Sequence, residues 1–183
     1  MTDRIHKLDA IENFRDFGGY ASRHGGRIAR RMLFRSAHHA AATDADLAAM
    51  AQLELGALVD LRRPKERSAQ PSRRPADFAA LVIECDLGDQ SDPPHLAFLR
   101  QTDLSPASVR DFYLDYYAHA PFQPQHRELF RRYFEALAIG EGGVLIHCTA
   151  GKDRTGLLAA LTHHILGANR DHIAADSRLA TTA

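Results

Sequence analysis

Residues 144–161 constrain the fold more than any other stretch of this chain, because three different patterns follow one another there without a break. Residues 144–146 are all apolar, and a run this short suits a buried strand. Leu157 opens a series of leucines and alanines that is typical of a helix. A strand that passes through a tight polar loop directly into a helix is the building unit of α/β folds with a parallel sheet.

The remaining patterns predict a single α/β domain over residues 1–183, with a central, mostly parallel sheet flanked by helices. A length of 183 residues is enough for one domain with its own core and too short for two ordinary domains. Further strands are expected at residues 32–34, 57–61 and 81–85. Helices are expected at residues 43–55, 95–100, 105–117, 125–138, 157–166 and 171–179, and Gly56 should end the first of them. The aromatic stripe of the helix at 105–117 has the spacing of a core-facing side, and part of it could line a pocket.

The composition excludes several classes of protein. The chain carries 23 Lys plus Arg and 23 Asp plus Glu, so no overall basic charge favours nucleic acid as a partner. No apolar run is long enough for a transmembrane segment, and the first residues lack the apolar stretch of a cleaved secretion signal. Two cysteines are too few for a disulfide framework. We therefore expect a cytoplasmic location, although export without a cleaved signal would leave no trace in the sequence.

The loop between the strand and the helix combines a nucleophile with an anion site. Consecutive backbone N–H groups at residues 149–154 can converge on one point there, with the positive end of a helix dipole behind them. Arg154 adds a planar guanidinium that can bind two phosphoryl oxygens at once. Cys148 stands at the mouth of the same site, which favours the nucleophilic thiolate. The pattern predicts hydrolysis of phosphate esters through a cysteinyl-phosphate, without a metal or cofactor; a structural cysteine buried in the turn is the alternative.

Two motifs resemble those of one known family. Residues 147–156 read His-Cys-Thr-Ala-Gly-Lys-Asp-Arg-Thr-Gly. This resembles the signature of the atypical bacterial tyrosine phosphatases that also hydrolyse phosphoinositides, within the cysteine-dependent phosphatase superfamily. Residues 13–19 read Asn-Phe-Arg-Asp-Phe-Gly-Gly and resemble an element near the start of the same family. The resemblance covers nearly the whole chain, and because relatives continue with further helices, it implies a short homologue or a truncated domain.

The resemblance implies a role for each residue of the loop. Cys148 would be the nucleophile, and Arg154 would clamp the phosphoryl group. His147 would orient the loop and help to keep the thiol ionised. Thr155 would donate its hydroxyl to the sulfur and so improve the leaving group of the second step, and Lys152 would add charge that suits a polyanionic head group. The phosphate-binding residues implied in this way are Thr149, Ala150, Gly151, Lys152, Asp153 and Arg154.

Several aspartates are candidates for the general acid that protonates the leaving oxygen. We favour Asp153, which lies inside the loop beside both the nucleophile and the bound phosphate; a structural role, bonded to loop amides or to Arg15, is the alternative. The second choice is the acidic segment after the third predicted strand. Its candidates are Asp86, Asp89 and Asp92. Asp60 at the end of a predicted strand comes third, with an ion pair to Arg62 or Arg154 as the alternative.

Three further residues are of interest outside the loop. We expect Arg15 and Asp16 of the second motif to border or support the site, and the alternative is a pair on the surface of an ordinary loop. Cys85 is expected to be a buried apolar cysteine at a strand end, and a protective disulfide with Cys148 is the alternative.

The sequence as a whole predicts an enzyme, namely a cysteine-dependent tyrosine or dual-specificity phosphatase that releases inorganic phosphate from a phosphorylated protein. A phosphoinositide or inositol-phosphate phosphatase is the alternative within the same chemistry. A phosphate-binding pseudophosphatase is the alternative outside enzymes, although the intact Cys148 and Arg154 speak against it. Exposed helix faces also suggest a homodimer.

Overall fold

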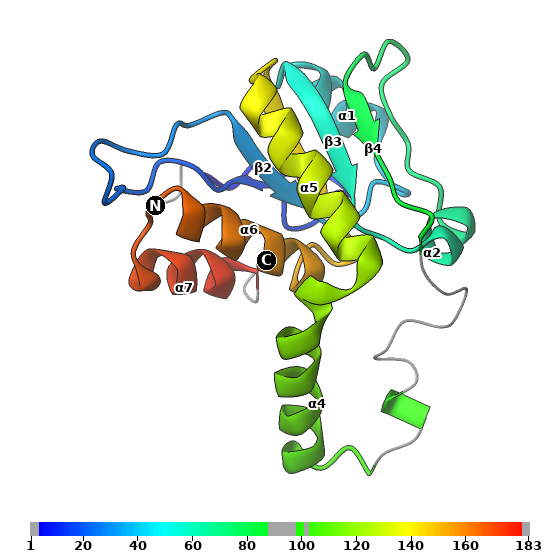
Figure 1. The fold of residues 1–183 in the computed structure, drawn as a ribbon. Coiled ribbons are helices and arrows are strands. Elements are labelled where there is room, and N and C mark those ends of the chain that lie inside the picture. The colour runs from blue at the N-terminus through cyan, green and yellow to red at the C-terminus, as the bar shows by residue number, and fades with distance from the viewer. Residues whose placement is uncertain (1–3, 88–97, 101–102, 181–183) are drawn as a thin grey trace.

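The computed structural model describes residues 4–87, 98–100 and 103–180, and it contains a five-stranded sheet with helices on both faces (Figure 1). The strands are β1 (Arg15–Asp16), β2 (Leu33–Ser36), β3 (Leu55–Asp60), β4 (Leu81–Ile83) and β5 (Gly143–His147). The helices are α1 (Asp44–Ala51), α2 (Pro64–Ala69), α4 (Pro106–His119), α5 (Pro124–Ile139), α6 (Asp153–Ile165) and α7 (Arg170–Leu179). A short 3-10 helix, η2 (Ala120–Phe122), joins α4 to α5.

The sheet has the strand order β1-β2-β5-β3-β4, and among the described strands only β1 runs antiparallel to its neighbour. Every residue of β5 is buried, because this strand lies in the middle of the sheet. The register aligns Ser36 of β2 and Asp60 of β3 with His147 of β5. The carboxyl ends of three strands therefore meet at one edge, the place where α/β sheets bind ligands. The predicted α/β class, with a mostly parallel sheet and flanking helices, is confirmed.

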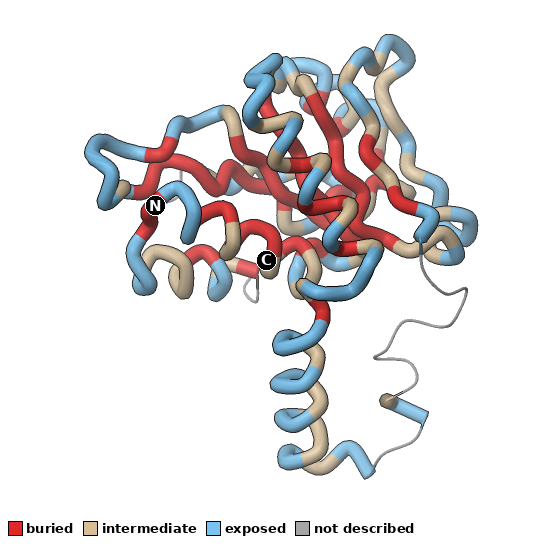
Figure 2. Tube along the Cα trace, in the orientation of Figure 1, coloured by how far each residue is buried: buried red, intermediate tan, exposed pale blue. Residues whose placement is uncertain are grey.

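Alternate side chains of the central strands point to opposite faces of the sheet and build two hydrophobic clusters. Val59 and Ile146 point to the face covered by α5 and α6, where they join Leu129. Leu58 and Leu145 point to the other face and join a cluster formed with α1 and the N-terminal segment. This alternation is that of a sheet buried on both sides, and Figure 2 shows the central strands as a continuously buried part of the chain.

Helix α5 packs across the central strands and confirms the helix predicted at residues 125–138. Its inner side carries the buried Leu129, Phe130 and Tyr133. Burial of such large side chains contributes about 1.5–3 kcal/mol each. The hydroxyl of Tyr133 lies 2.9 Å from that of Thr162 in α6, which satisfies a polar group inside the core. Helix α5 thus ties the sheet to α6.

The predicted end of the first helix is wrong. We expected this helix to include residues 53–55 and to stop at Gly56, but α1 ends at Ala51 and Gly56 lies inside β3. Glycine is needed there for a different reason, because a Cβ atom at this position would lie 1.9 Å from the carbonyl oxygen of Glu141. The close approach of the segment before β5, and not helix termination, explains this glycine.

Helix α4 extends away from the sheet (Figures 1 and 2). Its predicted N-cap is confirmed, because the Ser105 hydroxyl accepts a hydrogen bond from the N–H of Ser108. None of the residues of α4 is buried, so its aromatic stripe does not form the core that its spacing favoured. Among the helices of the described ranges, none combines the length and the apolar composition needed to cross a membrane.

Candidate active site

The chain passes from β5 to α6 through residues 148–152, and we call residues 148–154, which include the first two residues of α6, the cysteine loop. This loop lies at the carboxyl edge of the sheet and begins with Cys148, which is 3% exposed. Gly151 has a φ of 66°, and a Cβ atom there would lie 2.4 Å from the carbonyl oxygen of Ser36. Glycine alone tolerates both this conformation and this contact, so the loop can lie directly against the end of β2.

The backbone of the cysteine loop offers a row of hydrogen-bond donors. The N–H groups of residues 149–153 donate to no other described residue. Helix α6 begins at Asp153, so the positive end of its dipole adds to these groups. Free N–H groups at a helix N-terminus form an anion site. Because Cys148 begins the same loop, an anion bound there would lie beside its sulfur.

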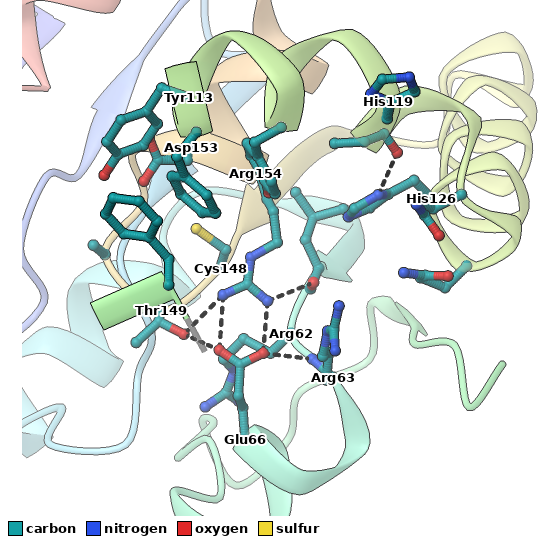
Figure 3. Close-up of a pocket in the computed structure, with 18 of the residues that line it drawn as sticks. Arg62, Arg63, Glu66, Tyr113, His119, His126, Cys148, Thr149, Asp153 and Arg154 are labelled. Carbon is teal, nitrogen blue, oxygen red and sulfur yellow. Dashed lines mark hydrogen bonds and ion pairs between the residues drawn. The ribbon is translucent and has the colours of Figure 1, made fainter. Parts of the chain in front are cut away.

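Arg154 is held by a carboxylate that the sequence did not assign to it. Its two terminal nitrogens donate to Glu66 of α2, at 2.6 Å to Oε2 and 2.7 Å to Oε1 (Figure 3). The Thr149 hydroxyl donates to the same carboxylate at 2.5 Å. Burial alone would raise the pKa of Glu66, but the hydrogen bonds and charge of Arg154 hold it at about 2. Glu66 therefore stays charged and fixes the direction of the guanidinium.

A cavity of about 880 Å³ opens beside the cysteine loop (Figure 3). Cys148, Asp153 and Arg154 lie in its wall. The rest of the wall is largely apolar and includes Leu61, Leu87, Phe112, Tyr113, Tyr116 and Leu129. The aromatic stripe of α4 thus lines a pocket, which was the second of its two expected roles. A phosphoryl group at the loop would leave its organic substituent against this apolar surface.

Asp153 receives a hydrogen bond from α4. The Tyr117 hydroxyl donates to Asp153 Oδ1 at 2.5 Å. Partial burial and this bond raise the pKa of Tyr117, so the phenol keeps its proton and acts as the donor. Neither Arg15 nor a loop amide bonds to Asp153 within the described part of the chain, so its expected structural partners are not the ones found. The sequence had singled out Tyr117 only as a member of the aromatic stripe.

Asp60 is fully buried at the end of β3 and does not line the cavity. Its carboxylate pairs with Arg62 at 2.7 Å, one of the two pairings expected for it. Burial alone would raise the pKa of Asp60, but His147 and Arg62 keep it below its ordinary value. A buried carboxylate that is charged and already paired fits structural support better than proton transfer.

His147 is fully buried on β5. Its Nδ1 lies 3.3 Å from the carbonyl oxygen of Cys148, and its Nε2 lies 3.6 Å from Asp60. Burial lowers the pKa of His147, with Asp60 opposing, so the imidazole is neutral near pH 7. The contact of His147 with the cysteine loop therefore acts on the backbone of the loop.

Arg15 and Asp16 are both buried, so the alternative of a pair on the surface is wrong. Arg15 binds the carboxylate of Asp176 in α7, with 3.3 Å between its Nε and Oδ1. Asp16 accepts hydrogen bonds from the N–H groups of Gly18 at 2.7 Å and Arg31 at 2.9 Å. Neither side chain lines the cavity, and both support the fold beneath it.

The remaining candidates are Asp86, Asp89, Asp92 and Thr155. Asp89 and Asp92 lie outside the described residues. Asp86 is exposed and pairs with Arg67. Thr155 is fully buried, and its hydroxyl has no hydrogen-bond partner in the described part of the chain. Donation from Thr155 to the sulfur of the nucleophile therefore stays a prediction.

Cys85 and Cys148 are both free, both buried, and both in the wall of the cavity. Cys85 follows β4 and Cys148 follows β5, and these two strands are separated by β3. At a strand spacing of about 4.8 Å the two Cα atoms are roughly 10 Å apart. This exceeds the span of about 7 Å that a disulfide bridges without backbone movement, so the geometry favours a buried apolar cysteine at position 85.

Comparisons with known proteins show the family of this chain. The model of the tyrosine phosphatase family matches residues 6–183. A protein of Cupriavidus necator, named by prediction as a tyrosine-protein phosphatase, is 37% identical over 172 residues, which cover 92% of this chain and 60% of that relative. The triple specificity protein phosphatase PtpB of Mycobacterium tuberculosis is 31% identical over 191 residues, which cover 94% of this chain and 67% of PtpB. The chain thus spans about 60% of the length of the first relative.

Among solved structures, P. aeruginosa TpbA is similar over 85% of this chain and 80% of TpbA, with 19% sequence identity and a TM-score of 0.43. A likeness at this level supports no argument about the residues of the site.

Proposed function

We propose that this chain, which belongs to the tyrosine phosphatase family, hydrolyses phosphate monoesters through a phosphorylated Cys148. The observation that carries the proposal is the cysteine loop, where five N–H groups that bond to no other described residue lie between a cysteine and an arginine fixed by Glu66. Donors held in this way stabilise the charge that develops on phosphoryl oxygens in the transition state, without reorganisation.

In the first step the sulfur of Cys148 attacks phosphorus. An S–P bond forms while the P–O bond to the leaving group breaks, and the loop N–H groups and Arg154 bind the non-bridging oxygens. Asp153, in the wall of the cavity, gives its proton to the leaving oxygen, which departs as a neutral alcohol or phenol. Tyr117 positions this carboxyl group through its hydrogen bond.

In the second step a water molecule attacks phosphorus and the S–P bond breaks. Asp153, now a carboxylate, takes a proton from that water, and inorganic phosphate leaves. Thr155 donates its hydroxyl to the departing thiolate, which makes the sulfur a better leaving group. Neither step calls on a metal or cofactor.

The cavity supports an aryl phosphate, such as a phosphotyrosyl side chain, as the first candidate substrate. Phe112, Tyr113 and Tyr116 can pack against its ring. A phosphoinositide is the second candidate, because the cavity is larger than one ring requires and Lys152 of the cysteine loop is exposed. The ratio of kcat/KM for a phosphotyrosyl peptide to that for a soluble inositol phosphate separates the two.

Turnover of p-nitrophenyl phosphate, with competitive inhibition by vanadate, is the direct test of the proposed function. We also expect iodoacetate to inactivate the protein by alkylating Cys148, and phosphate to protect it by occupying the loop N–H groups. Mass spectrometry of the alkylated peptide identifies the residue. Phosphate protection without any turnover would indicate a pseudophosphatase, and the absence of both would overturn the assignment of the site.

Substitution Asp153→Asn should separate proton donation from loop structure. The amide cannot give a proton to the leaving oxygen, so we expect kcat for phosphotyrosine to fall by about a hundredfold or more. An aryl phosphate whose phenol is strongly acidic leaves without a proton and should lose little. Steady-state rates on both substrates give the comparison, and equal losses would assign Asp153 to loop structure.

The variant Tyr117→Phe is the matched control for Asp153. It keeps the carboxyl group and removes only the 2.5 Å hydrogen bond from α4. If Tyr117 positions Asp153, the same dependence on the leaving group appears with a smaller loss, in the range of a few-fold to about tenfold for one hydrogen bond. A loss that does not depend on the leaving group would mean that Tyr117 does not position Asp153 for proton transfer.

A further inference from the structure

Five consecutive carbonyl groups of the cysteine loop, those of residues 148–152, each accept a hydrogen bond. His147 Nδ1 lies 3.3 Å from the carbonyl oxygen of Cys148, and the N–H of His38 donates to that of Thr149 at 3.0 Å. Two side chains donate to the other three carbonyls. Asn13 Nδ2 donates to Ala150 at 3.1 Å, and Arg35 Nη2 donates to Gly151 at 2.9 Å and to Lys152 at 3.4 Å. The carbonyl of Lys152 also accepts the N–H of Gly156 in α6 at the shorter distance of 2.8 Å, so the helix itself holds this carbonyl.

These carbonyls share their peptide planes with the N–H groups of the anion site. In a trans peptide the carbonyl of one residue and the N–H of the next point in opposite directions, and the described chain has no cis peptide bond. The carbonyls of residues 148–152 therefore oppose the N–H groups of residues 149–153. A donor that fixes a carbonyl on the outer side of the loop also fixes the direction of an N–H group on the inner side.

Asn13 and Arg35 are both connected to one carboxylate, that of Asp176 in α7. Arg35 Nη1 lies 2.5 Å from Asp176 Oδ2, and both side chains are at most 2% exposed. Arg15 Nε lies 3.3 Å from Asp176 Oδ1, and Arg15 Nη1 donates to Asn13 Oδ1 at 2.6 Å. Asp176 thus holds Arg35 directly and holds Asn13 through Arg15.

The same cluster places positive charge behind the loop. It contains two buried guanidinium groups and one carboxylate. Burial lowers the pKa of Arg35 to about 10, with Asp176 opposing, so its guanidinium stays charged near pH 7. The charge of Arg35 also attracts negative charge on Cys148. The cluster therefore both orients the loop and favours an anion on its far side.

We propose that Asn13 and Arg35 are positioning residues of the anion site, which turn the N–H groups of Gly151 and Lys152 toward the phosphoryl group, and that Asp176 anchors both. This inference rests on the proposed function, because it concerns the same phosphoryl site. It assigns a purpose to the motif at residues 13–16 and to α7, neither of which lines the cavity.

The test measures oxyanion affinity apart from turnover. In a Cys148→Ser background, binding of inorganic phosphate is measured by calorimetry with and without Asn13→Gly. Asn13 has a φ of 60°, which glycine adopts freely, so this change removes the donor without straining the backbone. We expect the phosphate Kd to rise by about three- to tenfold, the effect of one hydrogen bond. An unchanged Kd would overturn the role of Asn13.

Arg35→Lys tests the second proposed positioning residue. Lysine keeps a charge near Asp176 but lacks the planar group that reaches the acid and the Gly151 carbonyl together. We expect the phosphate Kd to rise by at least about tenfold, because the lost hydrogen bond involves a charged donor. Urea unfolding checks the fold of each variant. Where Arg35→Lys does not fold, Asn13→Gly alone decides the proposal.

Ser22→Ala is the matched control, since the Ser22 hydroxyl donates to the carbonyl of Leu166 at 2.7 Å, outside the cysteine loop. This variant should lose a similar side-chain to backbone bond and keep the phosphate Kd of its parent. Equal Kd values for Asn13→Gly and Ser22→Ala would overturn the inference while the proposed function stands. A Cys148→Ser parent that binds no phosphate would instead overturn the proposed function.

Discussion

Replacement of Cys148 by serine should abolish turnover and leave the fold intact. A serine hydroxyl at neutral pH is a far weaker nucleophile than a thiolate. We expect kcat on p-nitrophenyl phosphate to fall by roughly 10⁴-fold or more, as for the nucleophiles of other covalent enzymes. Because the substitution is nearly isosteric at a site that is 3% exposed, the urea midpoint should change little.

The chain offers its own control for this experiment. Cys85 is 6% exposed and lines the same cavity, so Cys85→Ser makes the same chemical change at another position in the wall. This variant should keep kcat within a few-fold of the parent. If Cys85→Ser lost as much activity as Cys148→Ser, with both proteins folded, the covalent role of Cys148 would be untenable.

Arg154→Lys should be almost as damaging, although it preserves the charge. The two terminal nitrogens of Arg154 are held by the two oxygens of Glu66, and lysine cannot reproduce this planar fork. The lysine variant would lose the proposed bidentate contact between Arg154 and the phosphoryl group, which strengthens in the transition state. We therefore expect kcat/KM to fall by roughly a hundredfold or more. Measurement of kcat/KM and of the vanadate Ki checks this, because both depend on how tightly the site binds the phosphoryl group in the transition state, which vanadate mimics.

Arg63→Lys provides the comparison for Arg154, since Arg63 lines the cavity but lies outside the cysteine loop, as the N-cap residue of α2. We expect kcat/KM within a few-fold of the parent. The difference in kcat/KM between Arg154→Lys and Arg63→Lys should hold across the pH range of ordinary assays. The carboxylate of Glu66, with its pKa lowered from 4.5 to about 2, stabilises the pair above pH 4.5 and loses this effect only as the pH falls toward 2. Equal losses in the two variants would mean that Arg154 is not the phosphoryl clamp.

The fold and the cysteine loop could be predicted because the sequence patterns that indicate them are local. The buried strand before Cys148, the helix after it and the cap at Ser105 each depend on residues within one or two turns of chain. The error at Gly56 has a non-local cause, because that glycine accommodates a carbonyl 85 positions further along the chain. Local patterns cannot distinguish a glycine that ends a helix from one that admits a neighbouring backbone.

The residues that shape the site from outside were missed for the same reason. Asp176 meets Arg15 and Arg35 across 161 and 141 positions, and Glu66 meets Arg154 across 88. Nothing in the helical pattern of α7 marks Asp176 as buried, since a carboxylate on a short amphipathic helix is usually exposed. Tyr117 was visible only as one aromatic residue among several. The signal that could have found these residues is a chemical one, namely a buried charge that needs a partner.

The anchoring of the anion site by Asp176 has a consequence for the order in which the protein matures. Synthesis releases the nucleophile and its arginine before it releases α7, so a growing chain contains every group that reacts before it contains the acid that aligns them. Contacts between such distant positions also form slowly during folding. On the proposed anchoring, a nascent chain with a complete cysteine loop should bind phosphate more weakly than the folded protein until α7 docks.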